Sequence, residues 1–256
     1  MTARVVSEGV LPCEPAREPG VVCLAASSHE PTLRAMAARI LGATSRRPLR
    51  VAVTYAAAGG PHAGRMNAYT AKLFDDAIVS RFTVAGEIPQ PMQSAEARET
   101  IAGADVIFVG GGDPVQGARL LGDSGADAWL RDARARGTPC FGISAGAIML
   151  AAWWATWPDH PAPGAPHDGG ELVRCAGVVP DLVVDCHAEE DDWNELHLVR
   201  NLLAERRSPL VLPAPPQPPP PLRFLGIPTG RGVIVGPDGA TEFVAGASIS
   251  LPPLVP

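Results

Sequence analysis

The sequence predicts an α/β fold, a three-layer sandwich in which helices cover both faces of a mostly parallel central sheet. Short apolar runs of strand length, bounded by glycine or proline, alternate along the chain with longer segments of helical period. The apolar runs contain few polar residues, which is typical of parallel strands that are buried on both faces. In such sheets ligands bind at the carboxyl ends of the strands.

The predicted elements follow one another in regular alternation from residue 21 onward. The strands of the sheet are predicted at residues 21–25, 49–54, 106–109 and 138–143. The helices between and after them are predicted at residues 32–41, 67–79, 94–102, 115–121, 126–136 and 147–154. The C-terminal third is predicted to hold strands at 172–179 and 182–186, a helix at 191–205, and a hairpin within 230–244 that turns at Pro237-Asp238-Gly239.

Residues 21–256 are predicted to form a single α/β domain, because a chain of this length can bury one substantial core. Residues 1–20 carry mixed charge without periodicity, and we expect an arm or an extra edge strand there. In residues 209–221, eight of thirteen residues are proline, which excludes a helix or a central strand. This segment is interpreted as a polyproline II connector or surface loop, with a proline-rich binding segment as the alternative.

The bulk composition favours a small-molecule or peptide ligand. The net charge of −6 comes without a basic stripe, which argues against nucleic acid as a partner. No apolar stretch approaches the roughly 20 residues of a membrane span, so we expect a cytoplasmic protein with no membrane partner. The five cysteines are odd in number and widely spaced, so we expect free thiols rather than disulfides or a zinc finger.

A predicted buried strand runs into three consecutive glycines in "ADVIFVGGGDPVQGARLL". Glycines 110 to 112 allow the backbone to approach a ligand closely and to direct N–H groups at an oxyanion or a carboxylate. A plain strand-to-helix turn is the alternative, although it needs fewer glycines. The chain contains neither a dinucleotide-binding G-x-G-x-x-G motif with its acidic partner nor a phosphate-binding G-x-x-x-x-G-K-[ST] motif.

The segment "CFGISAGAIML" fits the G-x-S-x-G pattern of a nucleophile elbow, with Ser144 between small neighbours. A predicted strand precedes Ser144 and a predicted helix follows it, so its hydroxyl would lie at a helix N-terminus that stabilises developing negative charge. Close packing of a strand against a helix would explain the same small residues. Nucleophile and packing residue therefore both remain open on this segment alone.

A serine hydroxyl needs a base to take its proton, and His187 is the best placed of the six histidines. It ends the strand-like run "LVVDCH", which would place it at the loop edge of a sheet. The alternative is a histidine that only satisfies its own hydrogen bonds at the end of a strand.

Together these segments resemble the aspartyl dipeptidase (dipeptidase E) and cyanophycinase family of serine peptidases, over about residues 21–235. The similarity rests on "FVGGGDPVQGARLL", on "GISAGA" and on "GVVPDLVVDCHAEED". The family has the class I glutamine amidotransferase-like fold, a flavodoxin-like arrangement, with serine in place of cysteine. The resemblance implies a hydrolase that cleaves small peptides at normal or isopeptide bonds through an acyl-enzyme. It implies no cofactor and no metal, and by analogy it allows for a homodimer.

The resemblance assigns Ser144 as nucleophile, His187 as general base and then acid, and Asp159 as the orienting carboxylate, with Asp185 or Glu189 as alternatives for Asp159. His187 follows Ser144 by 43 residues and Asp159 follows it by 15, and in the dipeptidase branch the acid comes at a similar short distance. The predicted oxyanion hole consists of the N–H of Ala145 and one from Gly111 or Gly112. Substrate-binding positions are expected at Asp113, Gln116 and Glu189.

Two departures from the family pattern affect the expected substrate. The histidine is followed by the acidic residues 189–192 instead of arginine-containing residues, and residues 226–229 read Gly-Ile-Pro-Thr where the family has Gly-Ile-Asp-Glu. An acidic mouth repels anions, so a neutral or cationic peptide is expected.

Two other functions remain as alternatives at this point. One is an inactive or altered ligand-binding member of the same fold. The other is a metal-dependent hydrolase, because Asp185, His187 and Glu189 alternate and would share one face of an extended strand.

Overall fold

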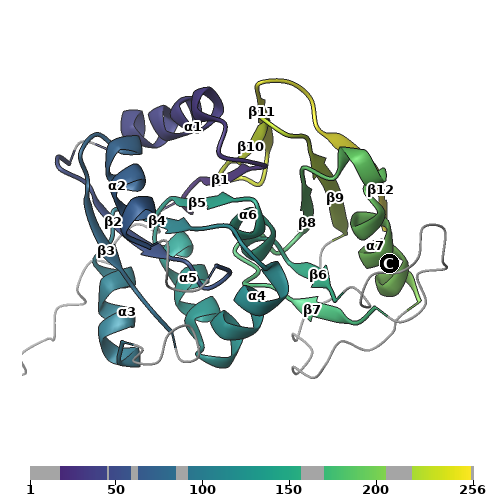
Figure 1. The fold of residues 1–256 in the computed structure, drawn as a ribbon, viewed down its shortest axis with the longest axis horizontal. Helices are drawn as coiled ribbons and strands as arrows, with labels where there is room; N and C mark the ends of the chain where they lie inside the picture. Colours follow the sequence, from purple (N-terminus) through teal and green to yellow (C-terminus); the bar gives the residue numbers. More distant parts are fainter. Residues whose placement is uncertain are drawn as a thin grey trace, which may run out of the picture.

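The computed structural model describes residues 18–44, 46–58, 63–84, 92–156, 170–205 and 221–254. It has an α/β architecture with a mostly parallel central sheet between two layers of helices, as the sequence predicted (Figure 1). The sheet has seven strands in the order β11-β10-β1-β5-β4-β2-β3. The strands are β1 (Val22–Ala25), β2 (Arg50–Thr54), β3 (Ile78–Arg81), β4 (Val106–Val109), β5 (Cys140–Ile143), β10 (Gly232–Val235) and β11 (Thr241–Val244).

The strands that carry the glycine loop and the elbow lie side by side at the centre of this sheet. β1 pairs in parallel with β5, β5 with β4, β4 with β2, and β2 with β3. β10 and β11 continue the sheet as an antiparallel hairpin. Because the carboxyl ends of β4 and β5 lie at the same edge, the loops that follow them meet there.

Helices cover the two faces of the central sheet in separate groups. α1 and α2 lie on one face, while α3, α4, α5 and α6 lie on the other (Figure 1). The helices are α1 (Glu30–Ala43), α2 (Ala63–Leu73), α3 (Ser94–Ala102), α4 (Pro114–Asp123), α5 (Ala126–Ala135) and α6 (Ala145–Leu150). Every residue of β1, β4 and β5 is buried, which explains their continuous apolar sequence.

The strand before the elbow is anchored by aromatic packing. On the α1 and α2 face, the ring of Phe141 stacks on Phe108 of the neighbouring strand, with centroids 5.7 Å apart. Phe74 meets the same ring edge-on at 5.8 Å. Aromatic pairs of these geometries stabilise a core beyond the apolar area that they bury. Phe141 therefore fixes β5 three residues before Ser144.

A second, smaller sheet lies beside the central one (Figure 1). It has the order β12-β9-β8, in which β8 and β9 are parallel and β12 is antiparallel. A two-stranded antiparallel ribbon of β6 and β7 and the helix α7 accompany it. These elements are β6 (Trp153–Ala155), β7 (Leu172–Arg174), β8 (Leu182–Cys186), the 3-10 turn η1 (Glu189–Asp191), α7 (Asn194–Ala204), β9 (Leu222–Ile227) and β12 (Ile249–Leu254).

Three predicted elements of the sequence need correction. The predicted helix at 67–79 ends at Leu73, and its last residues belong to the edge strand β3, because Asp75 and Asp76 adopt left-handed backbone angles that terminate the helix. The predicted helix at 147–154 ends at Leu150, and Trp153 and Trp154 form β6 instead. The predicted strand at 172–179 is shorter, since β7 stops at residue 174 and Gly177 turns the chain at φ 62°.

The predicted C-terminal hairpin is confirmed by β10 and β11. Its turn lies at Pro237-Asp238-Gly239, where Gly239 has φ 81° and the N–H of Gly236 donates to Ala240 O at 2.8 Å. The proline-rich residues 209–220 and residues 1–17 of the predicted arm lie outside the described residues. Within the described ranges, no helix combines the length and apolar character needed to cross a membrane.

The described cysteines are free thiols, as predicted, and each is buried. Burial raises the pKa of all four thiols, at positions 23, 140, 175 and 186. They therefore remain protonated at neutral pH and belong to the core. Cys13 lies outside the described residues.

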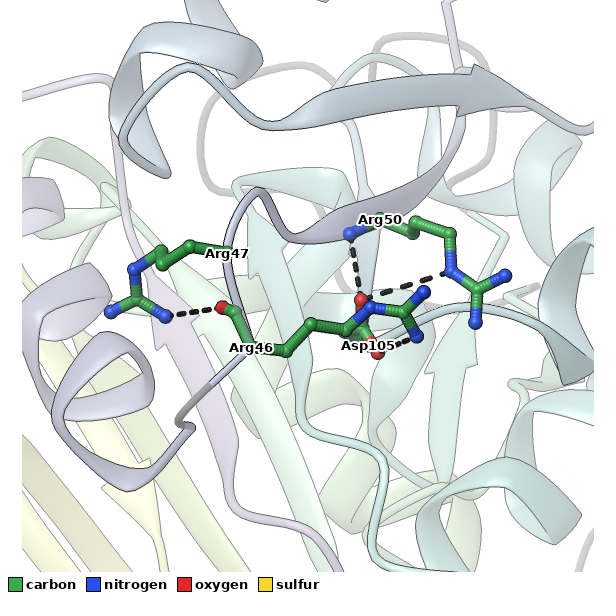
Figure 2. Close-up of polar contacts among 4 residues, drawn as sticks. All are labelled: Arg46, Arg47, Arg50 and Asp105. Carbon is green, nitrogen blue, oxygen red and sulfur yellow. Dashed lines mark hydrogen bonds and ion pairs between the residues drawn. The ribbon is translucent and has the colours of Figure 1, made fainter.

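The arginine cluster in Figure 2 lies at the amino ends of β2 and β4, at the opposite edge of the sheet from the elbow that follows β5. Asp105 immediately precedes β4, and its Oδ2 accepts the main-chain N–H of Arg50 at 2.8 Å. The Arg46 guanidinium lies 3.2 Å from Asp105 Oδ1, and the Arg50 Nε lies 3.9 Å from Oδ2. Both oxygens of this carboxylate are therefore paired, which links the first residue of β2 to the start of β4.

Candidate active site

Ser144 lies on a strained turn between β5 and α6. Its backbone has φ 53° and ψ −122°, which an L-residue with a side chain rarely adopts. The Ser144 N–H donates to Ala25 O at the end of β1 (2.8 Å), and its carbonyl accepts the N–H of Ala147 in the first turn of α6 (2.8 Å). These bonds hold the strained conformation, and they place the hydroxyl at the carboxyl edge of the sheet.

Two glycines flank Ser144 because the chain has no room for a β carbon at either position. A β carbon on Gly142 would lie 2.6 Å from Gly146 O, and one on Gly146 would lie 2.0 Å from Val109 O. Both distances are far below van der Waals contact. The two explanations for the small residues therefore hold together: the glycines allow close packing of α6 on β4 and β5, and that packing leaves the serine on the turn.

His187 meets Ser144 from the smaller sheet. It follows the last residue of β8, has φ 49°, and its N–H donates to Ile227 O of β9 at 3.0 Å. Its imidazole is exposed, and Nε2 lies 2.9 Å from Ser144 Oγ. The structure thus brings together the hydroxyl and the imidazole that the sequence analysis paired, from strands of two different sheets.

The glycine loop after β4 contacts the serine directly. A β carbon on Gly111 would lie 3.1 Å from Ile143 O and 3.2 Å from Ser144 Cβ, which is tighter than most such contacts, so a glycine favours this close approach. Gly112 has φ 141° and packs against Ala57 O. Among the described residues, no main-chain group accepts the N–H of Gly111 or Gly112. Ala145, the third predicted member of the oxyanion hole, is the first residue of α6 and follows Ser144 directly.

Glu189 is the ionised carboxylate next to His187. Its Oε1 accepts the N–H of Thr229 at 2.5 Å, and the Thr229 hydroxyl donates to Oε2 at 3.4 Å. Partial burial alone would raise the pKa of Glu189, but its own main-chain N–H, the two bonds from Thr229 and the charge of His187 hold the pKa below its usual value. Asp159, the predicted orienting carboxylate, lies outside the described residues.

Asp185 differs from Glu189 because it is buried, with 1% of its surface exposed. Its Oδ1 accepts the N–H of Cys186 at 2.7 Å, and its Oδ2 has no described partner within hydrogen-bond geometry. Burial and the nearby Glu195 carboxylate raise the pKa of Asp185 to about 8, and the N–H groups of Cys186 and Leu196 offset this only in part. At neutral pH Asp185 is therefore a neutral acid, and no hydrogen bond joins it to His187.

The alternation of Asp185, His187 and Glu189 does not place their side chains on one face. Asp185 points into the core, whereas His187 and Glu189 are exposed, because the left-handed backbone at His187 ends the strand. Within the described part of the chain, no group of three or more histidine, cysteine, aspartate or glutamate side chains is arranged to hold a metal ion. The three residues proposed as a metal site in the sequence analysis therefore do not form one.

Two of the predicted substrate-binding residues, Asp113 and Gln116, lie at the N-terminus of α4, beside the glycine loop. Asp113 is the N-cap, and its Oδ1 accepts the N–H of Val115 at 2.8 Å and of Gln116 at 3.1 Å. This arrangement satisfies main-chain donors that the helix leaves unpaired. The Gln116 side chain is exposed in the first turn. The structure gives Asp113 a capping role and leaves the Gln116 amide available at the same edge.

A hollow of about 570 Å³ lies at the other end of β1, away from Ser144. It is lined by charges of both signs, among them Glu18, Arg39 and Glu242. None of the residues around Ser144 and His187 lines this hollow. The candidate site therefore remains at the carboxyl edge of the central sheet.

The turn between β9 and β10, at residues 228–231, was not predicted from the sequence. Thr229 holds Glu189, and the N–H of Gly230 donates to Ser27 Oγ at 3.1 Å. The only sequence signal for this turn was the departure from the family pattern at residues 226–229, which showed the loss of two carboxylates but not the contact to Glu189.

The chain is similar to known peptidases in sequence and in fold. Residues 29–211 match the model of a protein family described as peptidase family S51. One similar solved structure is a peptidase from an acI-B1 Actinobacterium, with 17% identity, a TM-score of 0.57, and coverage of 91% of this chain and 97% of the other. Another is a putative peptidase E protein from Listeria monocytogenes EGD-e, with 13% identity, a TM-score of 0.52, and coverage of 91% and 98%. No curated protein matches the sequence.

Proposed function

The chain belongs to peptidase family S51 and is a serine peptidase, and from this premise we propose that Ser144 and His187 cleave amide bonds in small peptides through an acyl-enzyme. The observation that carries the proposal is the 2.9 Å contact between Ser144 Oγ and His187 Nε2. A contact of this length lets the imidazole take the hydroxyl proton as the serine attacks.

In the first half of the proposed reaction, Ser144 Oγ bonds to the carbonyl carbon of the substrate while its proton passes to His187 Nε2. The carbonyl oxygen becomes an oxyanion, which the N–H of Ala145 and one N–H from Gly111 or Gly112 would stabilise. His187 then gives its proton to the leaving amine as the amide bond breaks. In the second half, water attacks the acyl carbon and gives a proton to His187, which passes it to Ser144 Oγ as the bond between Oγ and the acyl carbon breaks and the acid product leaves.

A carboxylate is still needed to orient the imidazole. Asp159 keeps this role in the proposal, on the resemblance stated above. Asp185 is a poorer candidate because it is buried and neutral at pH 7. Glu189 is ionised and close enough for its charge to interact with His187, so it remains the alternative to Asp159.

The proposed substrate is a neutral or cationic small peptide. Residues 189–192 are all acidic, and the described side chains among them are exposed beside His187. Such a field repels an anionic substrate and attracts an ammonium or guanidinium group. Asp113, Gln116 and Glu189 are the proposed substrate contacts. A cytoplasmic location and a homodimer stay predictions from the sequence and the resemblance.

An active-site fluorophosphonate tests the proposal directly. We expect it to label the wild-type protein and to leave Ser144→Ala unlabelled. His187→Ala should lower both the labelling rate and the hydrolysis of a dipeptide panel by at least about 10³-fold. His197→Ala is the matched control, because His197 lies on α7 and should label as wild type does.

Absence of both labelling and turnover in the wild-type protein would refute the proposal and support the ligand-binding alternative. Activity that disappears on chelation, with Ser144→Ala still active, would also refute the proposal.

A further inference from the structure

The distance between Ser144 and His187 depends on how two separate sheets are joined. Ser144 is fixed to the central sheet through its N–H bond to Ala25 O, and His187 is fixed to the smaller sheet through its N–H bond to Ile227 O. The chain passes from the smaller sheet to the central one in the turn at residues 228–231, between β9 and β10. This turn therefore lies between the two halves of the candidate pair.

On the side of the smaller sheet, the turn holds the residues that flank His187. The N–H of Thr229 donates to Glu189 Oε1 at 2.5 Å, and the Thr229 hydroxyl donates to Oε2 at 3.4 Å. His187 is thus tied on one side through its own N–H and on the other through a residue two positions later. Because its imidazole is exposed, packing contributes little to fixing it, and its left-handed backbone has to be held by hydrogen bonds of this kind.

On the side of the central sheet, the next residue of the turn is tied to the loop after β1. The N–H of Gly230 donates to Ser27 Oγ at 3.1 Å, and the hydroxyl of Thr32 donates to Gly230 O. Ser27 lies two residues after Ala25, whose carbonyl accepts the N–H of Ser144. One path of hydrogen bonds and short chain segments therefore runs from the serine to the histidine.

We propose that Ser27 and Glu189 are positioning residues, which hold the turn at residues 228–231 from its two sides and so set the contact between Ser144 and His187. This inference rests on the proposed function. Proton transfer requires the two atoms to remain within hydrogen-bond reach, and a misplacement of about 1 Å costs up to about 100-fold in rate. Neither Ser27 nor Glu189 needs to touch the reacting atoms for this role.

Ser27→Ala tests the side of the central sheet. It removes the acceptor for Gly230 N–H, and we expect a loss of about fivefold to tenfold in kcat and in the fluorophosphonate labelling rate, with KM unchanged. Ser27→Thr keeps the hydroxyl and should restore most of both rates. Ser124→Ala is the matched control, because Ser124 also bonds main-chain groups but does so at the end of α4, away from the site.

Glu189→Ala tests the other side with an uncharged fluorophosphonate, whose labelling rate does not depend on a charge contact with substrate. We expect a similar loss of about tenfold, and Glu189→Gln should recover most of it because the amide oxygen can still accept the N–H of Thr229. In the double variant, Ser27→Ala with Glu189→Ala, the loss should be well below the product of the two single losses. Either change already loosens the same turn, which the hydroxyl of Thr32 and the N–H of Ala26 still hold in part through Gly230 O and Arg231 O.

Wild-type labelling rates in both Ser27→Ala and Glu189→Ala would overturn the inference while leaving the proposed function intact. Multiplying losses in the double variant, or a Ser27→Thr variant as slow as Ser27→Ala, would also overturn it. A wild-type protein that neither labels nor hydrolyses peptides would instead refute the proposed function, and the positioning role with it.

Discussion

Two aspartates at opposite ends of strands show how differently the chain treats its carboxylates. At the amino end of β4, Asp105 accepts the N–H of Arg50 and faces the guanidinium groups of Arg46 and Arg50 (Figure 2). At the carboxyl end of β8, Asp185 is buried, has one oxygen without a described partner, and has other carboxyl groups rather than a cation nearby.

The two surroundings separate a part of the chain that stabilises the fold from a part that destabilises it. Each oxygen of the Asp105 carboxylate has an N–H donor or a guanidinium group as partner, so the cluster joins β2 to β4. Around Asp185, Ser144 and His187, the chain carries left-handed backbone and a buried acid, and each of these features costs folding free energy. Such costs are expected near a site whose polar groups must be free to exchange partners with a substrate.

The largest expected effect comes from Ser144→Gly, which tests the carboxyl end. Activity should fall by at least about 10³-fold, because the nucleophile is removed. The free energy of unfolding should rise by about 1 kcal/mol, since glycine adopts φ 53° with little strain. Peptide hydrolysis and thermal unfolding measure the two effects. A variant less stable than wild type would show that the serine side chain contributes more than its backbone strain costs.

The next effect is a pH-dependent gain from Asp185→Asn. The pKa of Asp185 is raised from an ordinary value near 4 to about 8. Between these values the unfolded chain has released the proton and the folded chain retains it, so the stability of the wild type falls as pH rises across this window. The asparagine variant lacks this loss. Its advantage in denaturant unfolding should therefore be small at pH 4, grow towards pH 8 and then level off.

An advantage of Asp185→Asn that is the same at pH 4 and pH 8 would show that the folded chain does not hold a proton on Asp185. The two aspartates would then differ in burial but not in charge.

The smallest expected effect is at the amino end, in Asp105→Asn. The change removes the charge facing two arginines and keeps one oxygen for the N–H of Arg50, so we expect a loss of about 1 kcal/mol in stability. The loss should shrink in high salt, because both guanidinium groups are about half exposed. Peptidase activity should be unchanged. A stability gain of the kind expected for Asp185→Asn would contradict the contrast between the two ends.

The elbow could be predicted from the sequence because its geometry is local. Gly142 and Gly146 are needed within a few residues of Ser144, and the strand before it is a continuous apolar run. The sequence predicted that His187 would act as the base for Ser144, but not how the two side chains come into contact. The geometry of this contact depends on a second sheet whose strands β9 and β12 the sequence did not indicate, since both lie near proline-rich segments.

The errors in the fold arise where the hydrophobic period does not distinguish helix from strand. Residues 147–155 are apolar at nearly every position and are almost all buried, so nothing in the pattern shows that α6 ends at Leu150 and that β6 follows. The apolar residues Ile78 and Val79 of β3 continue the helical spacing of the apolar residues in α2. The predicted helix therefore ran on into the strand. The contacts of Ser27 and Glu189 to the turn at residues 228–231 join residues that are 203 and 40 positions apart, and no local pattern encodes them.

The packing of Phe141 also bears on how this site moves. With its ring held by Phe108 and Phe74, and with paired strands on both sides, β5 gives the serine little thermal freedom. His187 has no comparable anchor, because it lies at the exposed end of a strand in the smaller sheet. We therefore expect changes in the distance between the two side chains to come mainly from movement of the exposed His187 imidazole rather than of Ser144.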